Sequence, residues 1–302
     1  MYDFKTFGQM NLDCIFQGYE RFPEPGEEVF AKHFTLQLGG GPMVAPIVLN
    51  QLGYKVELGT FLGDNDVAEV CVKLMEKKGF RSYRSFPAPC EDPVVVTAVF
   101  STAEDRGFLA HNEQVYESCL PEDEVFDYLK DAKVTFAPVG HPAAAKRLHE
   151  AGVKIVFDNG WSDDLCIDKV KDLLPYVDVY TPNDKEAKKI ACTEDLEDAL
   201  RFLGKYTRNP VITLGKGGCA YLKDGRMATL PANDDFVAVD TTGAGDNFLT
   251  GVICGMVRDL PLECSLKLGN LFAGKSTTGV GCFGASITEE EVERFLEENE
   301  CI

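Results

Sequence analysis

Two aspartates surround a run of threonines, glycines and an alanine in "VDTTGAGDNFLTG", residues 239–251. The preceding residues 234–240 predict a strand, and the apolar residues from Phe248 onward recur at helical spacing, so residues 241–245 are expected at a strand-to-helix turn. Small residues at a helix start let a ligand approach the backbone, and the free N–H groups and helix dipole there favour an anion. The stretch therefore predicts an anion site formed by Gly243, Ala244 and Gly245.

Asp246, directly after this site, would repel a permanently bound phosphate. The conflict is resolved if the anion is transient and the carboxylate takes a proton from an attacking hydroxyl, as phosphoryl transfer requires. The alternative is that Asp246 only caps the helix, which would suffice for an isolated acid but leaves the glycine run unexplained.

The elements that must position this turn alternate between two patterns. Short apolar runs ending in turn residues predict strands at 134–140, 153–159, 177–183 and 210–216, and helical spacing predicts helices between them. This alternation favours a mainly parallel sheet flanked by helices, in which ligands bind at the carboxyl ends of the strands. Those ends carry Asp158, Asn183 and Gly215, and a capping box at Thr288 and Glu291 predicts a C-terminal helix.

The first third of the chain differs, because residues 13–37 and 92–113 are rich in strand formers and lack a helical period. We expect both segments to leave the main domain and pair into a small β lid that excludes water from a site. The alternative is that they are ordinary core strands. The whole chain, residues 1–302, is interpreted as a single α/β domain.

Charge and cysteine content limit the classes of partner. With 30 basic and 49 acidic residues, the net charge of −19 argues against nucleic acid and anionic membranes as partners. The eleven cysteines form no CxxC pair, which disfavours a zinc ribbon and favours reduced thiols in a cytoplasmic protein. No signal-peptide-like or membrane-spanning apolar stretch is expected.

The motifs in order resemble those of the ribokinase-like (PfkB) carbohydrate kinase family. "DTTGAGDNFLTG" is similar to its second signature, D-T-x-G-A-G-D, and "GGGPMVAPIVLNQLG" (39–53) resembles its N-terminal glycine signature. The family's remaining segments are matched by "NLD" (11–13), which resembles its N-x-D on the first strand, and by "PNDKEA" (182–187), "TLGKGG" (213–218) and "GNLFAG" (269–274). The resemblance spans roughly residues 5 to 296 and implies the ribokinase-like fold.

The resemblance also implies roles for individual residues. Asp246 would be the catalytic base beside an anion hole at Gly243, Ala244 and Gly245. The remaining positions form three groups: Asn183 and Glu186 would organise Mg²⁺ and phosphates through water; Thr213, Gly215, Gly218 and Asn270 would line the ATP site; and Asp13, Gly39, Gly40 and Gly41 would contact the acceptor.

Further family properties concern a cation and assembly. Many members bind a monovalent cation beside the anion hole, and Asp240 and Thr242, with Gly284 and Ser286 as looser matches, would hold K⁺ here. Family members often dimerise through the lid, so a homodimer is a candidate assembly. Taken alone, Asp13 could equally end a strand, Asn183 and Glu186 could simply start a helix, and "TLGKGG" could be a plain turn.

Three departures from the family pattern bear on the acceptor. Val44 stands where the first signature usually has an asparagine that bonds acceptor hydroxyls, so Val44 is expected to set a different specificity. Gly140 replaces an acid common in ribokinases, and "FDNGW" (157–161) lacks the arginine of related kinases. Few basic residues fall in the lid segments, which disfavours an anionic acceptor.

The resulting hypothesis is an ATP-dependent kinase of a neutral sugar or sugar-like alcohol. A nucleoside kinase is the first alternative, for which the lid aromatics Phe16, Tyr19, Phe100 and Phe108 could supply stacking surfaces. A ligand-sensing homologue without catalysis is the second. His111 and His141 fall near the expected acceptor cleft, although a structural role is the more frequent one for each. A dinucleotide-dependent dehydrogenase is disfavoured because "FGQMNLD" is no GxGxxG.

Overall fold

The computed structural model describes residues 1–101, 106–112, 119–233 and 235–302. Its central sheet has the strand order β10-β9-β8-β1-β4-β5, and every neighbouring pair is parallel. The strands are β1 (Tyr2–Phe7), β4 (Val56–Thr60), β5 (Tyr83–Ser85), β8 (Ala132–Phe136), β9 (Lys154–Phe157) and β10 (Val179–Tyr180). The predicted parallel sheet is thus confirmed, with strands shorter than their apolar runs.

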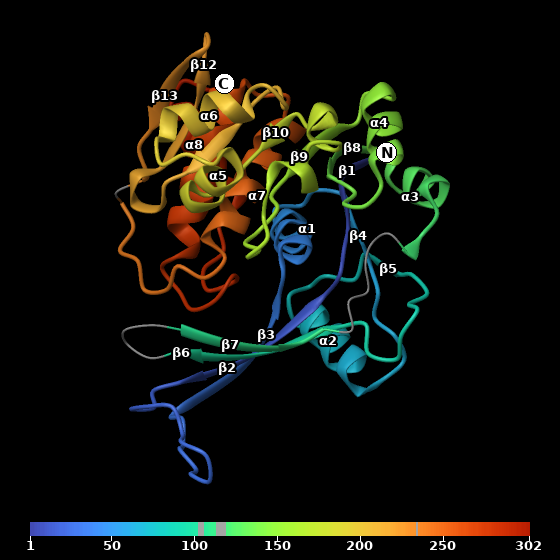
Figure 1. Cartoon of the computed structure of the whole chain (residues 1–302), viewed down its shortest axis with the longest axis vertical. Helices are drawn as coiled ribbons and strands as arrows, with labels where there is room; N and C mark the ends of the chain where they lie inside the picture. The colour runs from blue at the N-terminus through green and yellow to red at the C-terminus, as the bar shows by residue number, and fades with distance from the viewer. Residues whose placement is uncertain (102–105, 113–118, 234) are drawn as a thin grey trace.

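Helices cover both faces of this sheet (Figure 1). They are α1 (Gly41–Gln51), α2 (Asp66–Lys77), α3 (Glu122–Leu129), α4 (Pro142–Glu150), α5 (Asp184–Ala191), α6 (Leu196–Leu203), α7 (Ala244–Val257), α8 (Leu262–Ser276) and α9 (Glu289–Glu298). Alternation along β1 sends Phe4 into one core, with α1, α7 and α8, and Phe7 into the other, with α3 and α4. The two cores make three layers, with the sheet in the middle.

A second small sheet extends the edge beyond β10. Its strands are β11 (Val211–Thr213), β12 (Cys219–Lys223) and β13 (Arg226–Leu230), which pair antiparallel in that order. Isolated parallel bridges join Tyr180 to Pro210 and Asn183 to Thr213. The carboxyl end of β11 is therefore held next to the start of α5.

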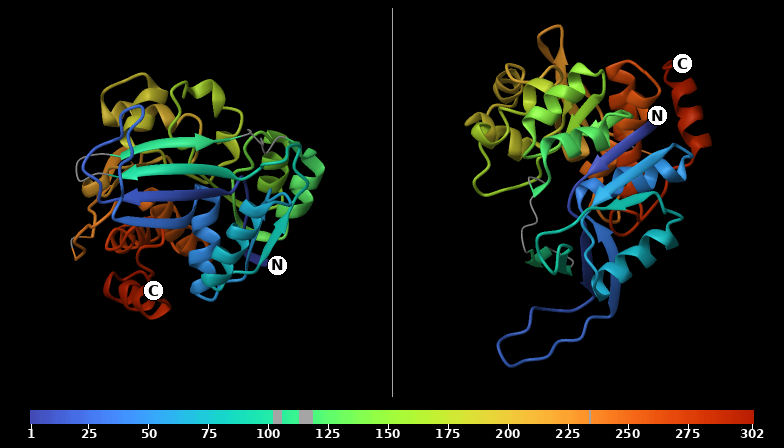
Figure 2. Two further views of the ribbon diagram at one scale, coloured as in Figure 1. Left: turned by 90° about the horizontal axis from the view of Figure 1, so that it is seen from below. Right: turned by 90° about the vertical axis from the view of Figure 1, so that its right-hand side faces the viewer.

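The two β-rich segments of the first third pair into one four-stranded accessory sheet of order β3-β2-β6-β7. It comprises β2 (Asn11–Gln17), β3 (His33–Gly39), β6 (Val95–Ser101) and β7 (Arg106–His111). The sheet crosses below the remaining structure, here called the body, and its strands lie side by side when seen from below (Figures 1 and 2). The prediction that these segments leave the main layers and pair with each other is confirmed.

Three expectations about local structure are corrected. Residues 235–240 form no strand, since the N–H groups of Val239 and Asp240 donate to the carbonyl of Thr277 at the end of α8 instead of to a neighbouring strand. The "NLD" motif lies on β2 of the accessory sheet, not on the first strand. Cys264 and Cys301 form a disulfide, so the thiols are not all reduced.

The C-terminal prediction is confirmed, because Thr288 and Glu291 form the expected capping box of α9. Among the described helices, none combines the length and apolar character that a membrane crossing requires.

Candidate active site

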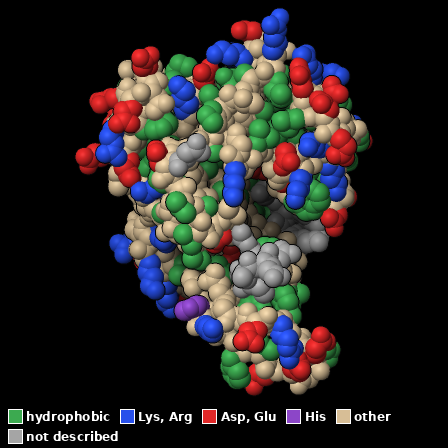
Figure 3. All heavy atoms as spheres, turned by 90° about the vertical axis from the view of Figure 1, so that its left-hand side faces the viewer, with side chains coloured by type: hydrophobic (Ala, Val, Ile, Leu, Met, Phe, Trp, Pro, Cys, Tyr) green, Lys and Arg blue, Asp and Glu red, His purple; other side chains and the backbone are tan. Residues whose placement is uncertain are grey.

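A cavity of about 480 Å³ lies at the carboxyl ends of the parallel strands. Strand ends β1, β8, β9 and β11 contribute Phe7, Phe136, Phe157 and Thr213, while the starts of α1, α5 and α7 contribute Gly41, Asn183 and the turn 241–246. The space-filling view shows a hollow between the body and the accessory sheet, on a face where acidic and basic side chains are mixed (Figure 3). The site is thus where the parallel-sheet prediction places it.

The start of α7 is fixed by close backbone packing. Gly243, the N-cap, has a φ of 72°, and a Cβ there would lie 2.6 Å from the sulfur of Cys282. The side-chain amide of Asn247 donates to the carbonyls of both Gly243 and Cys282, at 2.9 and 3.0 Å. A Cβ on Gly245 would meet nothing within 4 Å, so the first turn of α7 is open to the cavity.

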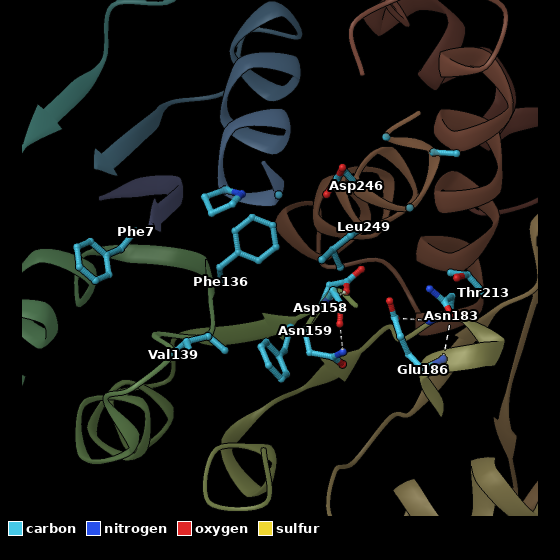
Figure 4. A pocket seen from close by; sticks show the side chains of 18 of the residues that line it. Phe7, Phe136, Val139, Asp158, Asn159, Asn183, Glu186, Thr213, Asp246 and Leu249 are labelled. Atoms are coloured by element: carbon cyan, nitrogen blue, oxygen red, sulfur yellow. Dashed lines mark hydrogen bonds between the residues drawn. The ribbon is translucent and has the colours of Figure 1, made fainter. Parts of the chain in front are cut away.

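Asp246 points into this cavity from the first turn of α7 (Figure 4). Burial, with a smaller contribution from the charge of Asp13, raises its pKa to about 6. A carboxylate with a pKa near neutrality is a stronger proton acceptor than an ordinary aspartate and is still ionised at pH 7. The position and the pKa both fit a general base.

The glycine run before α1 passes directly over two carboxylates. A Cβ on Gly39 would lie 2.2 Å from an oxygen of Asp13, and one on Gly41 would lie 3.2 Å from Asp246 Oδ1. Gly40 has a φ of 88°. Glycine is therefore required here for close approach as well as conformation. Of the predicted acceptor residues, Gly41 lines the cavity, whereas Asp13, Gly39 and Gly40 are not part of its lining, and Gly39 packs against Asp13.

Asn183 and Glu186 line the cavity and also begin α5. The Asn183 side chain accepts from the Glu186 N–H at 3.0 Å, and Glu186 Oε2 accepts from the Asn183 N–H at 2.9 Å (Figure 4). The helix-start interpretation is thus confirmed, and the same two residues line the cavity; their role toward Mg²⁺ and phosphates stays a prediction. Burial raises the pKa of Glu186.

The cavity also contains Asp158, which the sequence placed at the ligand-binding edge of the sheet without a specific role. Asp158 follows β9, and burial together with the charges of Glu186 and Asp246 raises its pKa to about 7. The signal was present, since an aspartate ends an apolar strand in "FDNGW", but spacing alone did not show that three separate acids would converge. The apolar wall of Phe7, Phe136 and Leu249 was also missed (Figure 4).

The four residues predicted for the nucleotide are only partly brought to the cavity. Thr213 lines it, whereas Gly215, Gly218 and Asn270 do not. Gly218 has a φ of 82° and its missing Cβ makes room for the carbonyl of Leu230. The amide of Asn270 donates to the Pro231 carbonyl at 2.8 Å, which fixes the chain after β13. Their contact with a nucleotide stays a prediction.

The residues predicted to hold a monovalent cation are also only partly brought together. Asp240 Oδ1 accepts from the N–H and hydroxyl of Thr242 at 2.9 and 2.7 Å, and Asp240 Oδ2 accepts from the Gly281 N–H at 2.9 Å. That this carboxylate contacts a monovalent cation stays a prediction. Gly284 packs against Gly279 in that turn, but the Ser286 hydroxyl bonds Gln51. The described residues include no group of three or more His, Cys, Asp or Glu side chains suited to a metal.

Two further expectations about the acceptor side are decided by burial. Val44 is 0% exposed within the core under α1, which contradicts the expectation that it meets an acceptor hydroxyl. His141 is buried and its ring nitrogens bond the carbonyls of Leu120 and Val139, so it is structural. His111 lies on β7 and lines a separate cavity with Asn65 and Asp92.

The comparisons with known proteins agree with this geometry. A model of the pfkB family carbohydrate kinases matches residues 3–289, so the chain belongs to this family and is a carbohydrate kinase. It is 25% identical to Probable fructokinase-4 of Arabidopsis thaliana, over 97% of this chain and 96% of that protein.

Two solved structures share the fold. The ribokinase of Arabidopsis thaliana, complexed with ribose and ATP, is 21% identical with a TM-score of 0.83 and covers 98% of this chain and 99% of its own. A nucleoside kinase of Burkholderia thailandensis in complex with inosine is 19% identical with a TM-score of 0.77, at 97% coverage of each chain. The ribokinase-like fold is therefore established.

Proposed function

We propose that the protein transfers the γ-phosphoryl group of ATP to a hydroxyl of a neutral sugar or sugar-like alcohol. The observation that carries this proposal is Asp246, which lies in the first turn of α7 with its pKa raised to about 6 and Asp13 nearby. Asp246 would take the acceptor proton as the oxygen attacks phosphorus, and the N–H groups at Gly243, Ala244 and Gly245 would stabilise the charge on the transferred group.

The residues around the cavity fit magnesium-bound ATP. Glu186 uses Oε2 in the capping box, and together with Asn183 and Asp158 it offers oxygen atoms to the waters of a hydrated Mg²⁺. The metal, when bound, would neutralise charge on the phosphates. Thr213 lines the cavity directly, and we propose that Gly215, Gly218 and Asn270 contact the rest of the nucleotide.

The charges of the cavity favour a neutral acceptor. Its described lining contains the acids Asp158, Glu186 and Asp246 but no Lys, Arg or His. A sugar phosphate or sugar acid would meet repulsion without a compensating cation. Asp13 would accept hydrogen bonds from acceptor hydroxyls, next to the close-packed Gly39, Gly40 and Gly41.

A nucleoside is the second candidate acceptor, because the apolar wall of Phe7, Phe136 and Leu249, with Val139 beside it in the lining, could contact a base. A protein without catalysis is disfavoured, since Asp246, Asn183 and Glu186 all reach the cavity. The deciding experiment is an ATP-consumption screen over pentoses, hexoses, ketoses, inositols, nucleosides and a sugar phosphate. A sugar phosphate as the best substrate would overturn the neutral-acceptor proposal, and acceptor binding without ATP consumption would overturn the kinase mechanism.

We also propose that K⁺ binds at Asp240 and Thr242, with backbone carbonyls of the turn 279–284, including Gly284, as further ligands. The cation would stabilise the start of α7 through the Gly281 and Cys282 contacts. Turnover should rise when K⁺ replaces a large organic cation at equal ionic strength. Equal rates in the two salts would contradict the site.

Residues 1–302 are proposed to act as one kinase domain in which the segments 13–37 and 92–113 serve as a lid. The accessory sheet presents Asp13 toward Asp246, and strand alternation places Phe16 on the opposite, outer face. Phe16 contacts Phe34 and Phe100 there, and Phe34 is 57% exposed. This aromatic outer face supports a homodimer through the lid.

A further inference from the structure

A further cavity, of about 240 Å³, lies outside both the proposed catalytic site and the cavity beside His111, where three elements meet. The C-terminal end of α2 contributes Lys77 and Lys78, strand β3 contributes Thr35 and Gln37, and the loop between α8 and α9 contributes Phe283. Helix α2 packs against β3 behind the accessory sheet (Figures 1 and 2). The cavity thus spans the junction between body and accessory sheet.

Its two lysines have no counter-ion within the part of the chain that the structure describes. Lys78 is half-buried, with its ammonium 5.1 Å from the centre of the Phe283 ring, and burial lowers its pKa. Removing an ammonium from water without a carboxylate partner is unfavourable. The arrangement is unusual in a chain with 49 acidic and 30 basic residues.

A favourable interaction with the helix dipole does not account for this arrangement. Lysines are common at helix C-termini, because the last carbonyls carry partial negative charge. The carbonyls of Lys78 and Gly79 already accept hydrogen bonds from Gln51 and Asn50 of α1. The dipole also acts on a fully solvated lysine and gives no reason for burying Lys78 against an aromatic ring.

We propose that this cavity binds the phosphate group of a small phosphorylated molecule. Lys77 and Lys78 would pair with the phosphate, the Thr35 hydroxyl would donate to it, and the Phe283 ring would contact the organic part. Inorganic phosphate presents the same group without the organic part. A phosphorylated sugar is expected to bind more tightly than inorganic phosphate, and this difference in affinity shows which of the two the cavity takes.

The cavity is connected to the catalytic turn through a short series of contacts. The Gln37 amide donates to the Val280 carbonyl at 3.4 Å, and Gly281 packs against the same side chain. The Gly281 N–H donates to Asp240, and Cys282 packs under Gly243. A ligand at Phe283 would therefore stabilise both β3, which leads into Gly39, and the loop that supports the start of α7.

This connection predicts coupling between the two sites, a part of the proposal that rests on the proposed kinase function. A ligand in this cavity would order β3 and the loop that supports α7, so that the acceptor pays less conformational entropy when it binds. The cavity ligand and the acceptor should therefore strengthen each other's binding. We expect the Kd for the acceptor to fall several-fold at saturating ligand, and the affinity for the ligand to rise by the same factor when acceptor is bound. The acceptor KM should fall as well.

Calorimetric titration with inorganic phosphate and with ribose 5-phosphate tests the binding without any catalysis. Wild-type protein is compared with Lys78→Gln, Lys77→Gln and the charge-retaining Lys78→Arg. The matched control is Lys73→Gln, which removes a charge from the same helix at a lysine that pairs with Glu69. Each neutral cavity variant should bind about tenfold more weakly, as expected for one lost charged hydrogen bond, while Lys78→Arg and Lys73→Gln bind as wild type does.

Three outcomes would overturn the proposal or its parts. Equal affinity in wild type, Lys77→Gln and Lys78→Gln would mean that phosphate binds elsewhere, and no binding of either probe at about 10 mM would remove the site altogether. If the variants lose binding but saturating ligand leaves the acceptor KM of the wild-type protein unchanged, only the coupling is refuted. None of these outcomes bears on the kinase function, which the ATP-consumption screen tests independently.

Discussion

At the scale of single residues, the site depends on acids that the fold holds close together. Asp13, Asp158, Glu186 and Asp246 come from four different elements, and burial raises the pKa of each. Carboxylates placed this close are unfavourable for the folded chain alone and become favourable when a cation or an acceptor proton is present. The arrangement indicates a site built for function at some cost in stability.

Asp246→Asn should lower kcat by at least about 100-fold, because the acceptor proton then has no base. The KM for ATP should be unchanged or slightly lower, because the substitution removes a negative charge that faces the phosphates. Steady-state kinetics of the purified variant provide the measurement. The matched control is Asp66→Asn, which removes an exposed acid from the first turn of α2. Turnover near wild type in Asp246→Asn would exclude it as the base.

Asp158→Asn should stabilise the protein, and more so at high pH. The folded-state pKa is raised from 3.8 to about 7, so the stabilising effect of the proton is full below pH 3.8 and is lost as pH rises through about 7. After discounting for partial exposure, the free energy of unfolding should rise by about 1–2 kcal/mol more at pH 8 than at pH 4.

Denaturant unfolding of the Asp158→Asn variant at the two pH values measures this difference. The control is Asp172→Asn, an exposed aspartate of the same region, which should show little change at either pH. A gain for Asp158→Asn that is equal at pH 4 and pH 8 would mean that the carboxyl is not held protonated by the fold.

At the scale of elements, helix starts position the chemistry. The first turn of α7 carries Asp246, and the capping box of α5 holds Asn183 and Glu186 at the cavity wall. The same capping-box geometry recurs at α9, with Thr288 and Glu291, but those residues lie outside the cavity. The two boxes allow the structural and functional roles of such a motif to be separated.

Asn183→Ala and Thr288→Ala should each reduce the free energy of unfolding by about 0.5–2 kcal/mol, since each loses one helix cap. Only Asn183→Ala should also reduce kcat, because the cavity wall loses the Asn183 side-chain oxygen that is proposed to face hydrated Mg²⁺, while Glu186 Oε2 keeps its bond from the N–H of residue 183. Thermal unfolding and steady-state kinetics of both variants make the comparison. Equal activity in the two would show that the α5 box is structural only.

At the scale of the whole molecule, the accessory sheet has two different faces. One presents Asp13 toward the site, and the other presents a group of aromatic rings whose centroids lie 5.0 to 5.8 Å apart. Exposed apolar patches of this kind mark interaction surfaces. A second copy of the chain covering the outer face would remove these rings from water and hold the sheet over the site.

Phe34→Glu should convert a dimer into a monomer, because it places a charge in the exposed aromatic group of each copy. Sedimentation velocity of wild type and variant measures the change. Met227→Glu on β13, far along the chain and also at the surface, is the control and should leave the assembly unchanged. A wild-type protein that sediments as a monomer would contradict the proposed assembly.

The sequence by itself determined the alternating architecture, the two β-rich excursions and the catalytic turn. These are local features: apolar spacing sets each element, and a glycine run before an acid needs no distant partner to be recognised. The strands predicted at 134–140, 153–159, 177–183 and 210–216 all formed, and residues 243–246 line the cavity.

Only the tertiary structure decided features that depend on packing between distant segments. Residues 235–240 had a strand-like pattern, but their backbone bonds the end of α8, where no strand is available to pair. Val44 had a family position beside the acceptor, yet it is fully buried. Asp158 was visible as a strand end, but its raised pKa depends on Glu186 and Asp246, which the fold brings to it. The disulfide of Cys264 and Cys301 likewise depends on the path of α9 back to α8, which no spacing of cysteines reveals.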